Sequence, residues 1–478
     1  MMRTPPGGTS SVRPRPAPVA VEDGQADTAV LRALRKIRLP QMQRNRELAL
    51  LIFAFIINGC AVVLVQLGAA GEVDPKFLIY LGVLTALALA LHITLRIVAR
   101  DADPFVVPIA TLLTGIGLAE IYRLDVHWGR HGWAAYSNRQ LAWAGIALVG
   151  AILVVVLLRN YRVLFRYTYI FGLAGIVLLL LPMVPGLGTD AGADVWISLG
   201  IFSFQPGEIA KICLAVFFAG YLGRTRDSLT STGTRFLGFT WPRARELGPL
   251  LVIWLISLGI IVLQRDLGTG LLIFGMFVAM LYVATGKTSW VLMGVVLAAG
   301  GAFAASRVLP YVHGRFDNWL NAFDPNLYAA RGGSAQLVNG IFGMAQGGLL
   351  GTGLGQGRPW LTPVAESDYI FPSLGEELGL IGLFAILALY MVFTSRGLRI
   401  GLNGQDDFGK LLAVGVSFTV ALQVVIMVGG VTRLIPLTGL ATPFLAAGGS
   451  SLVANWVIVA ILLRISDAVR SRPRVVIG

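Results

Sequence analysis

Three segments of the sequence place ionisable side chains within or at the start of apolar stretches, and the third, GEELG, ends the long polar stretch described below. The segment FQPGEIAK places Glu208 and Lys211 three residues apart, so they share one face of a helix and can form an ion pair. The segment QRDLGTG places Arg265 and Asp266 between two apolar runs, where glycines permit an irregular backbone. Ionisable groups at membrane depth usually face a cavity or a partner. The first two segments therefore indicate a polar cavity. The structural alternative is an ion pair that holds helices together for FQPGEIAK, and a turn at the membrane surface for QRDLGTG.

A polar, glycine-rich stretch from Arg315 to Gly379 separates two apolar parts of the chain. It is too long for a simple connection, and its regular apolar positions in AQLVNGIFGMA argue against disorder, so we expect it to be functional. Its run GGLLGTGLGQG lacks the Lys-Ser/Thr ending of a phosphate loop, so its glycines favour tight turns and close backbone approach. Glu376 and Glu377 open the next apolar run, and we expect at least one of them to stabilise the first turn of a helix.

The composition predicts a polytopic membrane protein. The chain has 478 residues, of which 56% are hydrophobic and 13% charged, and its mean hydropathy is +0.75. A soluble protein of this length cannot bury so much apolar surface. We therefore expect an all-α membrane bundle of about twelve transmembrane helices with a long external loop, the spans lying at about 47–68, 77–98, 103–122, 139–158, 166–184, 206–223, 247–263, 269–286, 290–309, 373–394, 408–430 and 446–467.

The basic residues fall mostly in short connections between apolar runs, as the positive-inside rule predicts. The net charge of +13 is therefore no sign of nucleic-acid binding. A basic segment precedes the first span and the number of spans is even, so both termini are expected in the cytoplasm. This topology places the loop 310–372 outside. Cys60 and Cys213 lie in apolar runs and indicate neither a disulfide framework nor a zinc site.

Six segments of the chain resemble, in the same order, the SEDS family (shape, elongation, division and sporulation proteins), which includes RodA and FtsW. They cover roughly residues 140–467 and read WISLG, FQPGEIAK, QRDLGTG, GGLLGTGLGQG, ESDYIFPSLGEELGLIG and RLIPLTGLATPFLAAGGSSLVANW. Arg265 stands where the family usually has a proline. The resemblance favours a RodA-like member with two extra N-terminal spans.

The resemblance implies a domain organisation. It places the SEDS glycosyltransferase core at residues 139–467, with the external loop 310–372 inside it. Before the core we expect an accessory transmembrane region at 47–138 and, at 1–46, a disordered and basic cytoplasmic tail. A short cytoplasmic tail at 468–478 follows the core.

The resemblance also implies an activity. Such proteins are peptidoglycan glycosyltransferases that polymerise lipid II, the undecaprenyl-pyrophosphate-linked disaccharide-pentapeptide, at the outer face of the bacterial cytoplasmic (inner) membrane. The implied partner is a class B penicillin-binding protein, the transpeptidase. The expected cellular role is cell shape and elongation, although the sequence does not separate this from cell division.

The reaction requires a sugar hydroxyl to attack an anomeric carbon that carries lipid pyrophosphate, so a general base is useful. Asp368, in the external loop, fits this role, and the resemblance assigns the same role to it; the structural alternative is a helix-capping aspartate. A divalent cation, Mg²⁺ or Mn²⁺, is plausible through Glu208 or Asp266, but no ligand set follows from the spacing. No organic cofactor is expected. The candidate substrate-binding residues are Lys211, Arg265, Arg315, Arg331, Gln336 and Glu377.

Two other functions compete with catalysis. A flippase or transporter of lipid-linked precursors would also use glycine-rich breaks and charges at membrane depth. It needs charges along a path to both faces, whereas the polar residues here concentrate on the outer side. A non-catalytic scaffold for other wall enzymes would tolerate loss of Asp368.

Overall fold

The computed structural model describes residues 23–184, 195–199, 202–230, 234–236, 239–241 and 248–471. The chain divides into two units, Met1–Met42 and Gln43–Gly478. The second unit contains the bundle and the site discussed below.

The described residues are mainly helical. The helices are α1 (Asp23–Ala69), α2 (Pro75–Val98), α3 (Val106–His127), α4 (Tyr136–Leu157), α5 (Val163–Arg166), α6 (Thr168–Leu180), α7 (Pro206–Thr230), α8 (Gly248–Gln264), α9 (Leu267–Thr285), α10 (Ser289–Val308), α11 (Pro310–Leu320), α12 (Pro325–Ala329), α13 (Ala335–Gly347), α14 (Ile370–Leu402), α15 (Asp407–Val431) and α16 (Gly449–Arg470). Short 3₁₀ turns occupy Gly132–Ala134, Leu181–Met183 and Pro359–Leu361. Two antiparallel hairpins pair β1 (Ile197–Leu199) with β2 (Phe202–Phe204) and β3 (Thr234–Phe236) with β4 (Phe239–Trp241).

The predicted multi-pass helical bundle is confirmed. Within the described residues, ten helices are long and apolar enough to cross a membrane, and the apolar segments Thr168–Met183 and Leu251–Gln264 are shorter. Together they correspond to the twelve predicted spans. Apolar side chains on the outward faces remain exposed, for example Val296 and Phe303 of α10 at 63% and 61%, as expected for lipid contact.

The N-terminal tail differs from the expectation of disorder. Helix α1 begins at Asp23, so the prediction of a disordered tail at 1–46 is wrong for residues 23–46, and residues 1–22 lie outside the described residues. The stretch from Ala26 to Glu47 has no glycine and is rich in Ala, Leu and Arg, which favour helix. Extending an existing helix avoids a new nucleation step, so the membrane span can extend toward the N-terminus.

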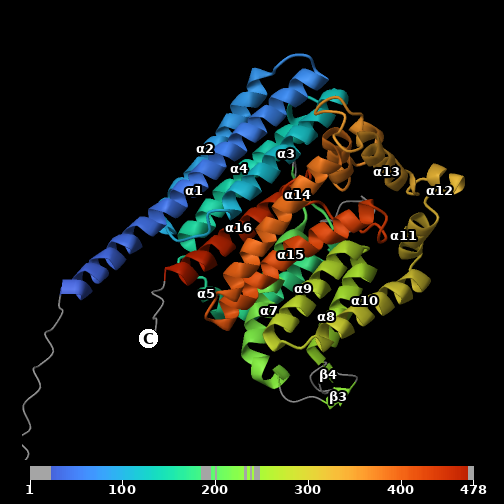
Figure 1. Cartoon of the computed structure of the whole chain (residues 1–478). Helices are drawn as coiled ribbons and strands as arrows, with labels where there is room; N and C mark the ends of the chain where they lie inside the picture. Colours follow the sequence, from blue (N-terminus) through green and yellow to red (C-terminus); the bar gives the residue numbers. More distant parts are fainter. Residues whose placement is uncertain are drawn as a thin grey trace, which may run out of the picture. The chain divides into compact units, whose positions relative to one another are not determined.

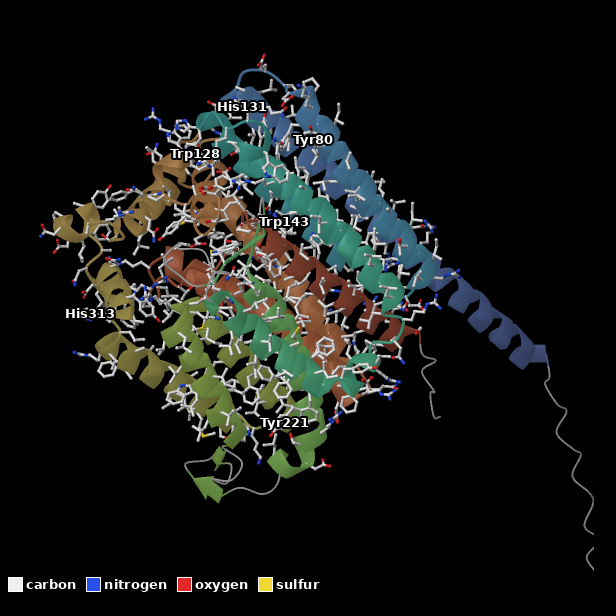
Figure 2. All side chains as sticks on the ribbon, turned by 180° about the vertical axis from the view of Figure 1, so that it is seen from behind. Tyr80, Trp128, His131, Trp143, Tyr221 and His313 are labelled. Carbon is white, nitrogen blue, oxygen red and sulfur yellow. The ribbon has the colours of Figure 1, made fainter. Side chains whose placement is uncertain are left out.

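Helices pack side by side in the bundle both with sequence neighbours and with helices distant in sequence. Helix α4 packs against α16, α9 packs against α15, and α14 packs against both α13 and α15 (Figure 1). Alternate connections leave the bundle at opposite ends, and Figure 2 shows His131 and Tyr221 at these two ends. The α6–α7, α8–α9, α10–α14 and α15–α16 connections share one end, because two spans separate each of them from the next and return the chain to the same end. This end carries the long external segment.

Buried hydrogen bonds hold the glycine-rich loop, which follows α13, against helix α14. Glu377 accepts hydrogen bonds from the Gly355 backbone N–H at 2.8 Å and from Arg123 Nε of α3 at 3.2 Å. Glu376 accepts from the Arg358 backbone N–H at 2.6 Å. The expectation that a carboxylate of this pair stabilises the first turn of its own helix is therefore wrong, since α14 begins at Ile370. Buried backbone N–H groups need acceptors, and these carboxylates supply them to the loop.

Gly379 interrupts the helical backbone of α14, with φ 66° and ψ −174°. A Cβ atom here would lie 2.3 Å from the backbone nitrogen of Gly351, so the close approach of loop and helix requires glycine. The interruption frees the next backbone N–H groups of α14, and Leu380 and Ile381 donate to the carbonyl oxygens of Gly348 and Leu349. The glycine-rich loop therefore provides tight turns and close approach, as predicted.

Substituting Glu377 by alanine is expected to destabilise the fold by about 3–5 kcal/mol, because it leaves the buried Arg123 charge and the Gly355 N–H without their acceptor. The exposed His313–Asp317 pair on α11, whose side chains are 62% and 42% exposed, is the control (Figure 2). Asp317→Ala should change stability by less than about 1 kcal/mol. Chemical denaturation of both variants in detergent measures the difference, and equal losses would contradict the role of the buried pair.

Candidate active site

A polar cavity of about 430 Å³ opens among the connections at this end of the bundle. Its walls come from the start of α7, the α8–α9 turn, α11, the loop before α14 and the α15–α16 connection. It brings together five residues that the sequence singled out, which are Glu208, Arg265, Asp266, Arg315 and Asp368. The tertiary structure thus joins segments spread over more than 150 positions of the chain into a single site.

A tight turn presents Asp368 to this cavity. The backbone N–H groups of Ser367 and Tyr369 both donate to the Val364 carbonyl, at 3.1 and 3.2 Å. Val364 has φ 59°, an uncommon conformation for a β-branched residue. The Tyr369 ring next to Asp368 is fully buried and anchors the turn. Asp368 is only partly exposed and lines the cavity, whereas a capping aspartate would face its own helix.

Burial raises the pKa of Asp368 to about 6. The positive charge of Arg315 opposes this shift, and the carboxylates of Asp266 and Glu366 add to it. A carboxylate with a pKa near neutrality is a stronger base than an ordinary aspartate and is still ionised at pH 7.

Arg315 lies beside Asp368 and is held by the backbone. Its Nη1 atom donates to the Leu437 carbonyl at 2.8 Å. A Cβ atom on Gly439 would lie 3.7 Å from both Arg315 Nη1 and an oxygen of Asp368, so Gly439 separates base and cation. Its φ of +78° also favours glycine. Among the described residues no carboxylate forms an ion pair with Arg315, which leaves its charge to the cavity.

The α8–α9 turn contributes a second cation and a second carboxylate. Asp266 caps α9, accepting from the Thr269 backbone N–H at 2.9 Å, and burial raises its pKa. Arg265 has φ 55°, and its exposed side chain forms no hydrogen bond with another described residue. The segment QRDLGTG therefore forms a turn between two helices and also part of the cavity wall. Both interpretations that the sequence left open, a turn and a cavity, hold for it.

Glu208 and Lys211 form the expected ion pair, with 2.5 Å between Nζ and the carboxylate. Lys211 also donates to Gln423 Oε1 of α15 at 3.1 Å, and Gln423 donates to the Ala441 carbonyl at 2.8 Å. The pair therefore joins α7 to α15 and to the cavity wall. Glu208 lines the cavity, whereas Lys211 is buried behind it.

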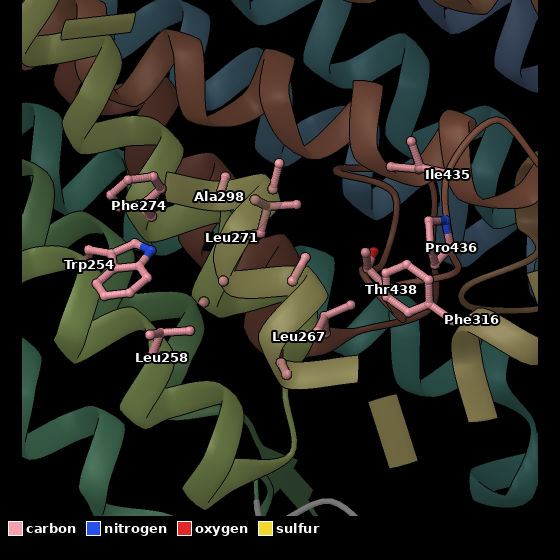
Figure 3. A pocket seen from close by; sticks show the side chains of 15 residues that line it. Trp254, Leu258, Leu267, Leu271, Phe274, Ala298, Phe316, Ile435, Pro436 and Thr438 are labelled. Atoms are coloured by element: carbon pink, nitrogen blue, oxygen red, sulfur yellow. The ribbon is translucent and has the colours of Figure 1, made fainter. Parts of the chain in front are cut away.

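An apolar groove of about 240 Å³ lies next to the polar cavity, between α8, α9 and α10 (Figure 3). Its wall includes Leu267, Phe316 and Thr438, each adjacent in sequence to a residue of the polar cavity. Trp254, Leu258 and Phe274 form the part of its wall away from Phe316 and Thr438. A molecule with a charged head and a hydrocarbon tail fits this pair of neighbouring spaces.

Residues 103–471 match the FtsW/RodA/SpoVE family, described as cell cycle proteins. The chain belongs to this family. The peptidoglycan glycosyltransferase RodA of Mycobacterium tuberculosis is 44% identical over 90% of this chain and 93% of its own length. The stage V sporulation protein E of Bacillus subtilis is 33% identical over 76% and 96%, respectively. The SEDS resemblance is therefore confirmed.

Solved structures of the FtsW/RodA/SpoVE fold agree with this architecture. A chain of a peptidoglycan synthase complex is 24% identical, with a TM-score of 0.62 over 78% of this chain and 99% of that chain. The rod shape determining protein RodA of Thermus thermophilus is 21% identical, with a TM-score of 0.52 over 78% and 98%. At this identity the similarity shows a shared fold.

The family region starts at residue 103 and so includes α3, whereas we placed the start of the core at residue 139. Helices α1 and α2 lie before the matched region. Arg123 on α3 donates to Glu377 and to the Gly357 carbonyl, so this helix supports the segment before α14.

Four candidate binding residues do not line the polar cavity of this family member, and one of them is Lys211, which is buried behind it. Arg331 is exposed in the segment before α13, and Gln336 lies on α13. Glu377 faces the glycine-rich loop instead. Their position in the long loop favoured them in the sequence, but only the three-dimensional path of that loop separates them from Arg315.

The sequence did not single out several cavity residues, among them Trp196, Gln205, Gly439 and Ser450. Gln205 donates its backbone N–H to Ser450 Oγ at 3.1 Å, which joins the α6–α7 connection to the first turn of α16. A signal existed for all four, because they lie in the segments WISLG, FQPGEIAK and RLIPLTGLATPFLAAGGSSLVANW that resemble the family. That resemblance carried no assignment for them.

Proposed function

We propose that this protein is a peptidoglycan glycosyltransferase that polymerises lipid II. The observation that carries the proposal is Asp368 in a polar cavity, beside Arg315 and next to an apolar groove. This combination suits a reaction between sugars attached to lipid diphosphates. The 44% identity to RodA of Mycobacterium tuberculosis, named a peptidoglycan glycosyltransferase, supports it independently.

In the proposed reaction Asp368 acts as general base. Its carboxylate accepts the proton of the acceptor hydroxyl while that oxygen bonds to the anomeric carbon of the donor sugar. The bond between this carbon and the diphosphate oxygen breaks, and the diphosphate leaves with the electron pair. The proton then passes from Asp368 to water. Diphosphate is a good leaving group, so the reaction does not require a second carboxylic acid.

Arg315 and Arg265 supply positive charge where the leaving diphosphate gains negative charge. Arg315 is fixed by the Leu437 carbonyl, and a pre-positioned donor costs little reorganisation during reaction. The groove of Figure 3 then takes the polyprenyl tail of the donor, since its wall continues directly from Asp266 and Arg315 to Leu267 and Phe316.

The divalent cation stays a prediction. No group of three or more His, Cys, Asp or Glu side chains among the described residues is placed to hold a metal ion. Glu208 is paired with Lys211, and Asp266 caps α9, so neither carboxylate is free to serve only as a ligand. The steps above therefore use no metal, and omission of Mg²⁺ and Mn²⁺ from the assay tests the prediction.

We further propose that the cavity end of the bundle faces outward from the cytoplasmic membrane and that both termini are cytoplasmic. The basic connections at the opposite end support this orientation, with Arg162 and Arg226 paired to Asp406 and Asp407. A class B penicillin-binding protein is the proposed partner. The similarity in fold to a chain of a peptidoglycan synthase complex supports it.

Incubation of the purified full-length protein with lipid II tests the function. Glycan strands resolved by gel electrophoresis are the expected product. The flippase alternative predicts labelled lipid II crossing vesicles without strand formation. The scaffold alternative predicts neither activity and normal growth of cells that carry Asp368→Ala. The location of the charged cavity at one end of the bundle favours the enzyme, since transport needs a polar path to both ends.

The rate should depend on pH through Asp368. The base must be ionised, so kcat/KM is expected to rise with pH through about 6 and then level off. Because this pKa is raised in the folded state, the contribution of Asp368 to stability is present at low pH and is lost as pH rises through about 6. Initial rates across the acidic range measure the first effect. An inflection at the ordinary aspartate pKa of about 3.9 would contradict the assignment.

A further inference from the structure

A second groove lies further along α11, one helical turn from the groove of Figure 3. Its volume is about 720 Å³, and it is lined by the end of α11, by Phe323 in the connection that follows, by α13 and by the two residues after α15. Most of its walls are apolar or aromatic, and the lining side chains are Trp319, Leu320, Phe323, Ile341, Met344, Ala345, Thr432 and Arg433.

Two segments of the chain border all three spaces. Helix α11 supplies Arg315 to the polar cavity, Phe316 to the groove of Figure 3 and Trp319 to the second groove. The segment 432–441 does the same, with Arg433 in the second groove and Thr438 in the other two spaces. The second groove is therefore a neighbour of the polar cavity along both walls.

Reciprocal hydrogen bonds fix the wall of the second groove. Trp319 Nε1 donates to the Arg433 carbonyl at 3.0 Å, and Arg433 Nε donates back to the Trp319 carbonyl at 2.7 Å. Arg433 also donates to the Leu320 carbonyl at 2.7 Å, and its guanidinium lies 5.2 Å from the centre of the Phe323 ring. These partners are carbonyl oxygens and an aromatic ring, so the positive charge of Arg433 remains available to an anion.

The surface around this groove suits a hydrocarbon occupant. Leu320, Phe323 and Phe342 are 57%, 56% and 57% exposed, and the Phe323 and Phe342 rings lie 6.4 Å apart. A contiguous apolar patch of this kind usually marks a binding surface. It lies at the outer end of α15, where a chain from the outer leaflet can enter.

We propose that the second groove binds the polyprenyl chain of the acceptor substrate, with Arg433 near its diphosphate. This inference rests on the proposed function. Polymerisation joins two molecules that both carry a lipid diphosphate, so two hydrocarbon chains must lie beside one reactive centre. The groove of Figure 3 holds the first chain. The second groove begins one turn further along α11, where the Phe316 and Trp319 rings lie 6.0 Å apart, and it shares the same two walls.

Photolabelling tests the site without requiring turnover. The probe is a heptaprenyl diphosphate that carries a benzophenone on its tail, added to the full-length protein in phosphatidylglycerol nanodiscs. Cross-links are expected on peptides that contain Phe323 or Met344, in addition to peptides from the groove of Figure 3. Labelling confined to the groove of Figure 3, or labelling by a benzophenone phospholipid with equal efficiency, overturns the proposal.

A matched pair of variants links the groove to catalysis. Ala345 is exposed and lines the groove, so Ala345→Trp fills it, whereas the exposed neighbour Gln346 lies outside the lining and Gln346→Trp is the control. Ala345→Trp should reduce labelling of the second groove and raise the KM for the long-tailed acceptor, each by about tenfold, as loss of a few buried methylene groups predicts. Transfer to an acceptor with a short, water-soluble tail should be unchanged.

The outcomes separate this inference from the proposed function. If the wild type labels the second groove but makes no glycan, the proposed function fails and the lipid site stands. If Ala345→Trp slows long-tailed and short-tailed acceptors equally, or neither, the acceptor site is wrong. Protection of the groove from the probe by the membrane segment of a transpeptidase, with the polymerisation rate unchanged, would assign it to a protein partner and overturn the proposal.

Discussion

Asp368→Asn is expected to lower the polymerisation rate by about 10²–10⁴, the usual contribution of a general base. Asparagine preserves the size of the side chain but cannot accept the hydroxyl proton at neutral pH. The loss should appear in kcat rather than in KM, because the proton moves only as the bond forms. Strand synthesis from lipid II under steady-state conditions measures both constants. Retention of activity within about tenfold of wild type would exclude Asp368 as the base.

A stability measurement distinguishes this loss from misfolding. Burial raises the pKa of Asp368, so the ionised carboxylate is disfavoured in the folded protein at neutral pH. The neutral amide removes this cost, and the thermal midpoint of Asp368→Asn should equal or exceed that of the wild type at pH 7. Glu366→Gln is the matched control, since Glu366 is a nearby carboxylate that does not line the cavity. It should retain near-normal activity.

Arg315→Ala is expected to reduce kcat/KM by about 10²–10³, comparable to the removal of one preorganised donor from a site of developing negative charge. Its guanidinium faces the cavity beside Asp368 and is held by the Leu437 carbonyl. The positive charge of Arg315 lowers the pKa of Asp368, so its loss should raise that pKa. The acidic limb of the pH profile should then move to higher pH. Steady-state kinetics as a function of pH measure both effects.

Arg331→Ala provides the comparison for Arg315→Ala. Both arginines lie in the long external segment, but Arg331 is exposed and does not line the polar cavity. Its substitution should change kcat/KM by less than about threefold, in line with other surface positions. Similar losses in the two variants would mean that the net charge of the external segment attracts lipid II, and the specific role of Arg315 would be wrong.

The helical spans could be predicted because the physics of a bilayer acts on composition and length. About twenty consecutive apolar residues satisfy their backbone hydrogen bonds internally only as a helix, whatever they pack against. The tail before the first span was harder to predict, because local polarity suggested disorder while helix-forming residues between Ala26 and Glu47 allow α1 to extend. The carboxylates Glu376 and Glu377 were misassigned for a related reason: sequence position indicated a helix start, but the helix begins earlier, at Ile370.

The sequence by itself determined the class of protein, its spans, and which ionisable residues occupy costly positions, since these follow from the free energy of placing each side chain in a bilayer. It also singled out Asp368, because a carboxylate in a polar external segment suits the chemistry that the family resemblance implies. Only the tertiary structure decided that Arg315 lies beside it while Arg331 and Glu377 do not. The physical reason is that a long loop gains its path from distant contacts, such as Arg123 with Glu377 and Arg315 with Leu437, which local sequence does not encode.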